Sequence, residues 1–322
     1  MDGEMGMMLS RRSFLAGMGA AAAIPARALA SCPFRVAVIN DEISQDFDHA
    51  CYVAAHDFGL QWIELRGMWN KNITTLDAGE LTQARTILAK HKLRVTDIAS
   101  PLYKVDWPGA PLSNQSERRD QFHADYDFKK QDVLLEHCIE LAKTFGTDRI
   151  RCFDFWRLDD VTPYRAAMNE TLRKAARRCA KSDLILLLEN EMSCNTATGP
   201  EAAATLKAVT EPNFMLNWDP GNAATFPGSD PFPQGYDLLP KKRIGHCHAK
   251  NVVRQPGGKW EWAPVGTGVV DWAAQLRALD RDGYRYAVSL ETHWRGAGTP
   301  EASSRISMQG LKAALAKAGT GC

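Results

Sequence analysis

The sequence predicts an α/β fold, a (β/α)8 TIM barrel, on three observations. Short and almost continuously apolar runs recur along the chain from residue 34 onward, which is typical of parallel strands covered on both faces. Amphipathic stretches separate these runs, and their apolar residues recur at intervals of three and four, as on one face of a helix. The apolar runs number eight, and eight strand–helix units close a barrel of this type.

Each apolar run is interpreted as one strand, and each amphipathic stretch as the helix that follows it. An open doubly wound sheet is the alternative. It calls for a glycine-rich phosphate turn after an early strand, and INDEIS (39–44) is no such turn. We expect the long connections 103–123 and 251–268 to line the top of the barrel. The predicted strands are 34–39, 61–66, 93–100, 149–155, 184–190, 213–219, 243–249 and 286–291, and the clearest helices are 78–92, 131–146, 168–182 and 271–283.

Residues 1–30 are predicted to be a twin-arginine export signal that precedes a single barrel domain, 31–322. Arg11 and Arg12 stand before an alanine-rich apolar run that ends in a small-residue cleavage site at 28–30. This run is too short for a membrane span, which needs about 20 residues. We therefore expect a periplasmic protein. LASC (29–32) also resembles a lipoprotein processing box, so a lipid anchor at Cys32 is the alternative.

The amino-acid composition limits the classes of molecule that the protein is expected to bind. The 322 residues carry a net charge of +1, with 39 basic and 38 acidic side chains, so no global field favours nucleic acid or an anionic membrane. The eight cysteines include no CxxC pair and are interpreted mostly as small buried side chains without thiol chemistry, although a periplasmic location permits disulfides. The sequence leaves the oligomeric state open, a homo-oligomer included.

Four ionisable residues fall at the ends of four successive predicted strands: Glu189, Asp219, His248 and Glu291. Catalytic groups of such barrels gather at the carboxyl ends of the strands. Three buried carboxylates side by side require a compensating charge. A divalent cation supplies it; this donor set favours Mn²⁺ or Mg²⁺, and Co²⁺ or Zn²⁺ are also compatible. His246, two residues before His248, is expected to pack one layer deeper in the barrel.

Each of the four residues also has an ordinary structural interpretation. Glu189 could pair with a buried arginine, Arg151 or Arg243. Asp219 could start a turn, since Asp-Pro-Gly-Asn is a turn sequence. Glu291 could cap a helix or pair with an arginine. The metal interpretation is favoured because four independent coincidences would have to fall at successive strand ends.

The segments LLLENE (186–191), LNWDPGN (216–222), GHCHAKNVVR (245–254) and VSLETHW (288–294) resemble those of the xylose isomerase-like TIM barrel superfamily. The likeness is to its sugar phosphate isomerase/epimerase, or D-tagatose 3-epimerase-like, branch, and it extends loosely over 34–316. The resemblance implies that Glu189, Asp219, His248 and Glu291 bind one divalent metal, that Glu189 and Glu291 are also catalytic proton-transfer groups, and that Arg254 contacts the substrate. Asn222 and Asn195 depart from that pattern, which has a histidine and a glutamate there.

The function predicted from these residues is a metal-dependent sugar isomerase or epimerase. It abstracts a proton next to a metal-bound carbonyl of a small carbohydrate, through an enediolate. Lys250 stands where many epimerases carry an acid, so one alternative is a lyase or hydratase acting on a keto-sugar or 3-keto-glycoside. Lys250 and Glu64 are further candidates for substrate binding, although Glu64 could instead pair with Arg66. Another class of alternative is a non-catalytic sugar-binding barrel; phosphodiester cleavage is disfavoured because histidines are few and charge is balanced.

Overall fold

The computed structural model describes residues 1, 32–111, 127–226 and 228–322 of the chain. The predicted export signal and part of the connection 103–123 lie outside the described residues. Eight helices and twelve strands are assigned within the described part. The strands are β1 (Arg35–Val38), β2 (Trp62–Leu65), β3 (Gly67–Met68), β4 (Lys71–Asn72), β5 (Arg94–Leu102), β6 (Arg149–Cys152), β7 (Ile185–Glu189), β8 (Phe214–Trp218), β9 (Ile244–Ala249), β10 (Asn251–Arg254), β11 (Trp260–Ala263) and β12 (Ala287–Leu290).

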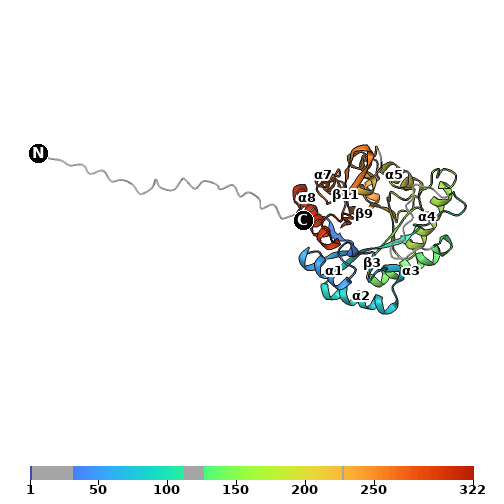
Figure 1. The fold of residues 1–322 in the computed structure, drawn as a ribbon, viewed down its shortest axis with the longest axis horizontal. Helices are drawn as coiled ribbons and strands as arrows, with labels where there is room; N and C mark the ends of the chain where they lie inside the picture. Colours follow the sequence, from blue (N-terminus) through green and yellow to red (C-terminus); the bar gives the residue numbers. More distant parts are fainter. Residues whose placement is uncertain (2–31, 112–126, 227) are drawn as a thin grey trace. The chain divides into compact units, whose positions relative to one another are not determined.

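The helices follow the barrel strands in the order that the sequence predicts. They are α1 (Phe47–Tyr52), α2 (Ala78–His91), α3 (Gln131–Phe145), α4 (Arg165–Ala180), α5 (Gly199–Ala208), α6 (Pro220–Ala224), α7 (Trp272–Arg281) and α8 (Pro300–Ala318). Short 3-10 or π segments are η1 (Asn40–Glu42), η2 (Val53–Asp57), η3 (Ile73–Thr75), η4 (Phe128–Lys130), η5 (Pro231–Gly235), η6 (Lys241–Arg243) and η7 (Pro256–Gly258). In Figure 1 the helices surround the strands, and the colours run around the ring in chain order.

Within the described residues, eight parallel strands form one sheet in the order β1-β12-β9-β8-β7-β6-β5-β2. A single parallel bridge between Ile39 and Glu64 joins the two ends of this sheet, so the barrel is nearly closed. The predicted (β/α)8 fold is confirmed, because all eight predicted apolar runs overlap these strands. Apolar runs such as Ile185–Glu189 form strands because the ring of helices covers their outer face while the barrel interior covers the other.

Local signals explain where several helices begin and end. Asp77 caps α2 and forms a capping box with Glu80, which satisfies two otherwise unpaired backbone N–H groups. Thr198 does the same for α5. Gly146 ends α3 in the left-handed conformation, which glycine adopts without steric cost. These caps set the lengths of the helices and so the places where the strand-end loops emerge.

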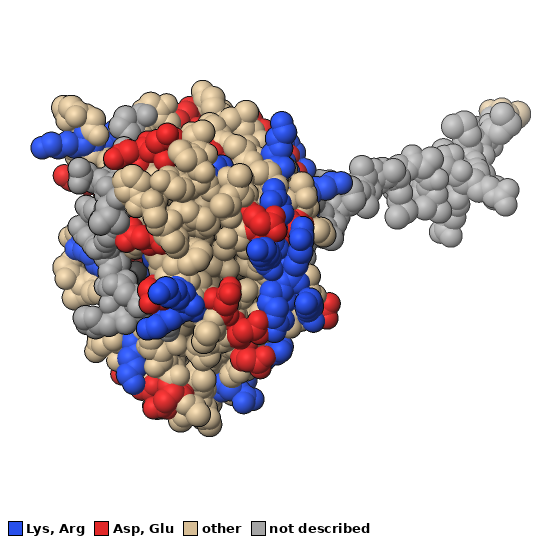
Figure 2. Space-filling view, turned by 90° about the vertical axis from the view of Figure 1, so that its right-hand side faces the viewer, with Lys and Arg blue, Asp and Glu red and all other residues tan. Residues whose placement is uncertain are grey.

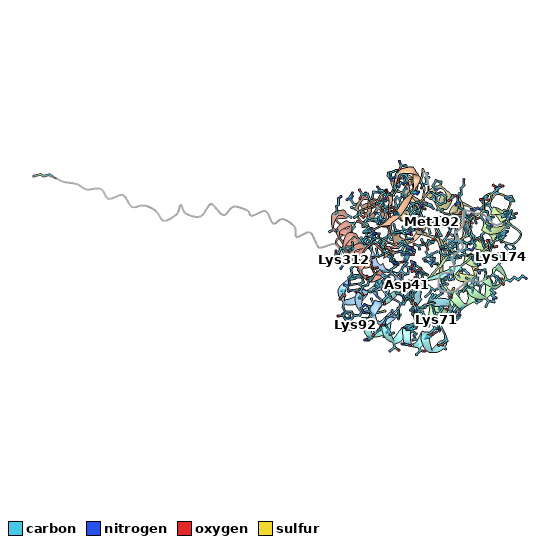
Figure 3. All side chains as sticks on the ribbon, viewed as in Figure 1. Asp41, Lys71, Lys92, Lys174, Met192 and Lys312 are labelled. Carbon is cyan, nitrogen blue, oxygen red and sulfur yellow. A yellow bond between two sulfur atoms is a disulfide. The ribbon has the colours of Figure 1, made fainter. Side chains whose placement is uncertain are left out.

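Two small hairpins, β3–β4 and β10–β11, follow the second and seventh barrel strands. For the connection 251–268, the sequence analysis expected a loop at the top of the barrel. Asp41 lies near the centre of the ring in Figure 3, whereas Lys92, Lys174 and Lys312 lie at its periphery. On the face that Figure 2 displays, acidic and basic side chains are interspersed. None of the helices in the described part of the chain has the length and apolar content required to cross a membrane.

The cysteines divide into two groups. Cys51, Cys138, Cys152, Cys179, Cys194 and Cys247 are free and buried, as the sequence analysis expects of small apolar side chains. Cys32 and Cys322 form a disulfide across 290 residues of sequence. The sequence analysis did not assign this pair, because spacing alone does not say which cysteines meet. In this structure the sulfur of Cys32 is bonded to Cys322, and the lipid anchor at Cys32 stays an untested alternative.

Candidate metal centre and active site

The four residues at the ends of the last four parallel strands come together, as the sequence analysis predicts. Glu189 ends β7, Asp219 directly follows β8, His248 lies in β9 and Glu291 directly follows β12. Each offers one ligand atom, and these four atoms all lie within 4.8 Å of one another. All four side chains are buried, with relative exposures of 3% or less.

The turn after β8 serves two purposes. Asp219 caps α6 because its Oδ1 accepts the backbone N–H of Asn222 at 2.8 Å, so the turn interpretation of Asp-Pro-Gly-Asn is correct. Its second oxygen, Oδ2, points instead to the cluster, 3.8 Å from Nδ1 of His248. Gly221 allows this turn to approach the end of β9, since a Cβ there would lie 2.7 Å from Cβ of Lys250.

Glu189 and Glu291 are arranged like Asp219: one oxygen of each accepts from a protein donor and the other points to the cluster. In Glu189, Oε2 accepts from Arg151 at 3.0 Å, while Oε1 lies 3.2 Å from Nδ1 of His248. In Glu291, Oε1 accepts from Arg66 at 2.5 Å, while Oε2 lies 3.1 Å from the same Nδ1. Each carboxylate of the cluster thus has one oxygen held by the protein and one directed to a common point.

Lys250 is the third basic residue beside this cluster. It is 1% exposed, and its Nζ lies 2.9 Å from Oδ2 of Asp219, 2.6 Å from Oε2 of Glu291 and 3.0 Å from Oδ1 of Asn222. Neither of these two carboxylate oxygens accepts a hydrogen bond within the described residues, so Lys250 contacts them as an ion pair.

These observations test whether the residues fit a divalent cation. Two buried carboxylate oxygens that accept no hydrogen bond within the described residues, a third one from Glu189 and an imidazole nitrogen converge. This is a donor set that Mn²⁺, Mg²⁺, Co²⁺ and Zn²⁺ accept. The residues fit the group. The arginines pair with the opposite oxygens of the glutamates, so the alternative that Glu189 simply pairs with Arg151 holds for one of its oxygens only.

The pKa values of the cluster residues are shifted because three carboxyl groups lie close together there. Burial opposes ionisation of Glu189, but His248 and Arg151 outweigh it and lower the pKa to about 2. Burial raises the pKa of Asp219 to about 7, since the nearby Lys250 does not offset it and Glu291 adds to it. Burial also opposes the charged form of His248, but Glu64, Glu189 and Glu291 raise its pKa well above 6.5. Without a metal ion, protons supply the missing positive charge.

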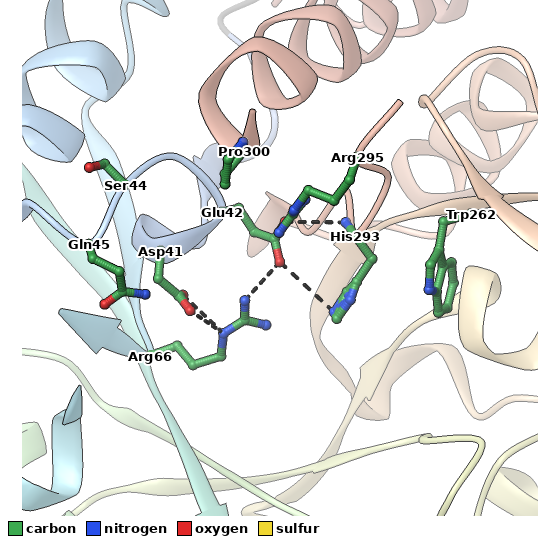
Figure 4. A pocket seen from close by; sticks show the side chains of 9 residues that line it. All are labelled: Asp41, Glu42, Ser44, Gln45, Arg66, Trp262, His293, Arg295 and Pro300. Carbon is green, nitrogen blue, oxygen red and sulfur yellow. Dashed lines mark hydrogen bonds and ion pairs between the residues drawn. The ribbon is translucent and has the colours of Figure 1, made fainter. Parts of the chain in front are cut away.

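Arg66 and His293, which both contact Glu291, line a pocket of about 310 Å³ (Figure 4). Arg66 is buried between the carboxylates of Asp41 and Glu42, at 2.9 and 2.7 Å, and reaches on to Glu291. Nε2 of His293 lies 3.2 Å from Oε1 of Glu291. The pocket is lined by Asp41, Glu42, Ser44, Gln45, Arg66, Trp262, His293, Arg295 and Pro300.

The sequence analysis missed Asp41 and Glu42 and treated Arg66 only as a partner for Glu64. Asp41 and Glu42 lie in η1, directly after β1, and Arg66 directly follows β2. The sequence analysis looked for active-site residues at the carboxyl ends of the last four barrel strands. The same search at the ends of the first two strands would have identified Asp41, Glu42 and Arg66 as well.

The other predicted substrate contacts lie in different places. Arg254 is exposed and donates to the carbonyl oxygens of Ala224, at 3.3 Å, and Ser229, so no described contact joins it to the cluster. Glu64 is fully buried and contacts His248 rather than Arg66 within the described residues. His246 is fully buried as expected, with Nδ1 3.1 Å from Oδ1 of Asn217.

The two residues that depart from the epimerase pattern have structural partners. Asn222 donates to Oε1 of Glu189 at 3.2 Å and accepts from Lys250. Asn195 donates to three successive carbonyl groups, those of Asp154, Phe155 and Trp156, at 2.9–3.2 Å. Asn222 therefore belongs to the candidate site, and Asn195 holds the loop that follows β6.

Comparison with known proteins decides the family. A family model described as xylose isomerase-like TIM barrel matches residues 52–314. The chain belongs to the xylose isomerase-like TIM barrel family. Among proteins of curated function, a search found no match. The family assignment agrees with the barrel topology and with the position of the cluster at the strand ends.

Several solved structures share the fold of this xylose isomerase-like barrel. One is a xylose isomerase-like TIM barrel protein from Mycobacterium smegmatis in complex with magnesium, with 18% identity, TM-score 0.62 and coverage of 84% of this chain and 89% of that one. Another is the probable 3-DHS dehydratase AsbF from Bacillus anthracis, with 21% identity, TM-score 0.63 and coverage of 86% and 97%. A third is D-psicose 3-epimerase with D-tagatose from Clostridium cellulolyticum H10, with 14% identity, TM-score 0.61 and coverage of 88% and 98%.

Proposed function

We propose that this chain is a divalent-metal-dependent sugar isomerase or epimerase. The observation that carries the proposal is the division of oxygens in the cluster: Glu189, Asp219 and Glu291 each have one oxygen held by protein donors and turn the other toward Nδ1 of His248. Similar barrels in complex with magnesium and with D-tagatose support it. Glu189, Asp219, His248 and Glu291 would hold the cation, with Mn²⁺ or Mg²⁺ favoured.

When bound, the cation would polarise a carbonyl group of the sugar and so acidify the neighbouring C–H bond. The remaining chemistry falls to the residues of the chain. Glu189 and Glu291 are ionised, since the pKa of each is lowered despite burial, so either can accept a proton from carbon. The partner glutamate can return a proton from the other side, which gives an epimer; return to the neighbouring carbon gives an isomer.

The arginines and the pocket would position these groups. Arg151 and Arg66 each hold one oxygen of a glutamate, which fixes the direction in which the other oxygen points. His293 has its pKa lowered to about 4, because burial and the nearby Lys250 disfavour its charge, so it offers a neutral imidazole to a hydroxyl. The indole of Trp262 forms an apolar wall suited to the C–H face of a sugar.

A lyase is the second candidate, and Lys250 favours it. Its ammonium lies 2.6 Å from Glu291, beside the carboxylate that would take the proton. If that deprotonation is followed by breakage of a C–O bond at the next carbon, Lys250 could donate a proton to the leaving oxygen. The similarity to a probable dehydratase supports this candidate. The substrate would then be a keto-sugar or a 3-keto-glycoside.

We also propose that the protein is exported to the periplasm by the twin-arginine route. Support comes from the paired residues Arg11 and Arg12 in the predicted signal and from the disulfide between Cys32 and Cys322, since disulfides persist in oxidising compartments.

The experiment that tests the function is incubation of Mn²⁺-loaded protein with a panel of keto-sugars and 3-keto-glycosides in D₂O. Deuterium uptake at one carbon, followed by NMR, is expected for an isomerase or epimerase, and release of an aglycone or water for a lyase. Glu291→Gln is the matched variant, since it keeps the shape and removes the base. Absence of both products from a metal-loaded protein that binds sugar would contradict an enzymatic role and favour a non-catalytic sugar-binding barrel.

A further inference from the structure

Glu64 lies beneath the cluster, inside the barrel, with 0% exposure. We propose that Glu64 is a positioning residue: it accepts the proton on Nε2 of His248 and so fixes the tautomer whose Nδ1 is free to bind a divalent cation. This inference rests on the proposed function, because it assumes the metal site. It differs from the sequence-based prediction in that Glu64 holds the imidazole of His248 and does not bind the substrate.

The geometry around His248 assigns a different task to each ring nitrogen. Nε2 lies 3.0 and 3.2 Å from the two oxygens of Glu64. Nδ1 faces Oε2 of Glu291, Oε1 of Glu189 and Oδ2 of Asp219 at 3.1, 3.2 and 3.8 Å. Only a ring nitrogen without a proton can bind a metal ion, so the proton of the neutral imidazole must stay on the side of Glu64.

Asn217 offers the competing arrangement. Its Nδ2 lies 3.1 Å from Nε2 of His248 and could donate to that nitrogen. The proton of a neutral imidazole would then move to Nδ1, which would exclude a metal ion from the cluster. Oδ1 of Asn217 contacts Nδ1 of His246 at 3.1 Å, which orients the amide but leaves its Nδ2 beside the ring of His248.

The carboxylate of Glu64 decides between the two arrangements. Both of its hydrogen bonds in the described part of the chain are to His248, and Nε2 of His246 is more distant, at 3.8 Å. If Nε2 of His248 carried no proton, a fully buried carboxylate would face a nitrogen lone pair, which is costly. Carboxylates that accept from the second nitrogen of a ligating histidine are common around protein metal sites, and their loss weakens metal affinity by about 10–100-fold.

Metal affinity is the first test, and it does not depend on turnover. Mn²⁺ titration of the full-length wild type by calorimetry is compared with Glu64→Leu, Glu64→Gln and Asp97→Asn. Asp97 is the matched control because it is also fully buried and lies 3.3 Å from Nε2 of His246, with no described contact to His248. We expect Glu64→Leu to weaken Mn²⁺ binding about 10–100-fold, Glu64→Gln to weaken it less, and Asp97→Asn to leave it unchanged.

The tautomer is the second test. In Mg²⁺-loaded protein with ¹⁵N-labelled histidine, long-range ¹H–¹⁵N spectra should place the proton of His248 on Nε2, in the wild type and in Glu64→Gln. A proton on Nδ1, or wild-type affinity in Glu64→Leu, would overturn the inference. If Glu64→Leu does not fold, the Mn²⁺ affinity of Glu64→Gln and the His248 tautomer in that variant decide whether the inference holds. Failure of the wild type to bind Mn²⁺ would instead contradict the proposed function.

Discussion

The ammonium nitrogen of Lys250 lies 2.6 Å from Oε2 of Glu291, so a basic side chain of the protein already contacts a carboxylate of the predicted metal centre. The same nitrogen is 2.9 Å from Asp219. Lys250 thus bridges two of the four candidate ligands. Its charge favours the ionised form of both carboxylates in the absence of a metal ion.

Lys250→Met should therefore destabilise the metal-free protein. Removal of one partner from a buried ion pair leaves an uncompensated charge and costs about 3–5 kcal/mol. Urea denaturation should detect this loss, and Mn²⁺ should restore much of it by neutralising Asp219 and Glu291. Lys71→Met is the control, because Lys71 pairs with Glu80 at the surface and such pairs contribute about 0–1 kcal/mol. Equal losses of unfolding free energy in Lys250→Met and Lys71→Met would argue against the role of Lys250 as a bridge between Asp219 and Glu291.

Lys250→Met should also separate the two candidate reactions. Loss of a charged group that stabilises developing charge lowers kcat by about 10²–10³-fold. We expect a loss of that size in aglycone or water release if the protein is a lyase, with Mn²⁺ affinity at least as high as in the wild type. Proton exchange into an unreacted keto-sugar should fall much less. The two rates are measured on one sample by NMR in D₂O.

Metal affinity should depend on pH through Asp219. Burial raises the pKa of this carboxyl to about 7 in the metal-free protein, so it is protonated below that pH and a metal ion must displace the proton. Displacing the Asp219 proton should raise the apparent Kd for Mn²⁺ by up to about tenfold for each pH unit below 7, because metal ligands must be deprotonated. The proton on His248, whose pKa is also raised, adds to this effect. Calorimetry between pH 5.5 and 7.5, in buffers of different ionisation enthalpy, measures affinity and proton release together. A flat profile without proton release would contradict the assignment.

Trp262 should contribute to substrate binding. Its ring lines the pocket and lies 5.3 Å from the ring of His293. Stacking on an aromatic side chain contributes about 0.5–1.5 kcal/mol, so Trp262→Ala should raise KM by up to about tenfold with a smaller change in kcat. Trp260 is on the same hairpin, 4.8 Å from Trp262, and does not line the pocket, so Trp260→Ala is the matched control. A larger rise in KM for Trp260→Ala than for Trp262→Ala would show that the pocket is not the substrate site.

The disulfide between Cys32 and Cys322 should stabilise the folded protein, because it restricts the unfolded chain. Disulfides typically contribute about 2–4 kcal/mol, so Cys322→Ser or reduction should lower the Tm. Intact-mass analysis of the exported protein checks the linkage: a disulfide lowers the mass by about two hydrogen atoms, whereas a lipid on Cys32 raises it by a whole acyl-bearing group. A lipidated Cys32 would contradict the disulfide and support the alternative of a lipid anchor.

Much of this structure could be predicted from sequence because the signals are local. The run that ends in Glu189 is apolar throughout, so a buried strand and its acidic end are visible together. The same holds for Asp219 and Glu291. The rule that active-site groups follow the barrel strands then brings residues together that are far apart in sequence.

The rest depends on contacts between distant segments, which a pattern does not encode. The arrangement of Arg66 between Asp41, Glu42 and Glu291 joins the first, second and last barrel strands, and each residue alone resembles a surface charge. Arg254 was assigned by resemblance, yet the hairpin β10–β11 places it against backbone carbonyl groups. The pairing of Cys32 with Cys322 depends on a contact between residues separated by 290 positions in the sequence.

A crystal structure of the Mn²⁺-loaded protein, with anomalous diffraction recorded on either side of the manganese edge, tests the central claim most directly. The account predicts one anomalous peak within about 2.0–2.3 Å of Nδ1 of His248 and of an oxygen from each of Glu189, Asp219 and Glu291. A peak elsewhere, or no peak while Lys250 alone bridges Asp219 and Glu291, would contradict it.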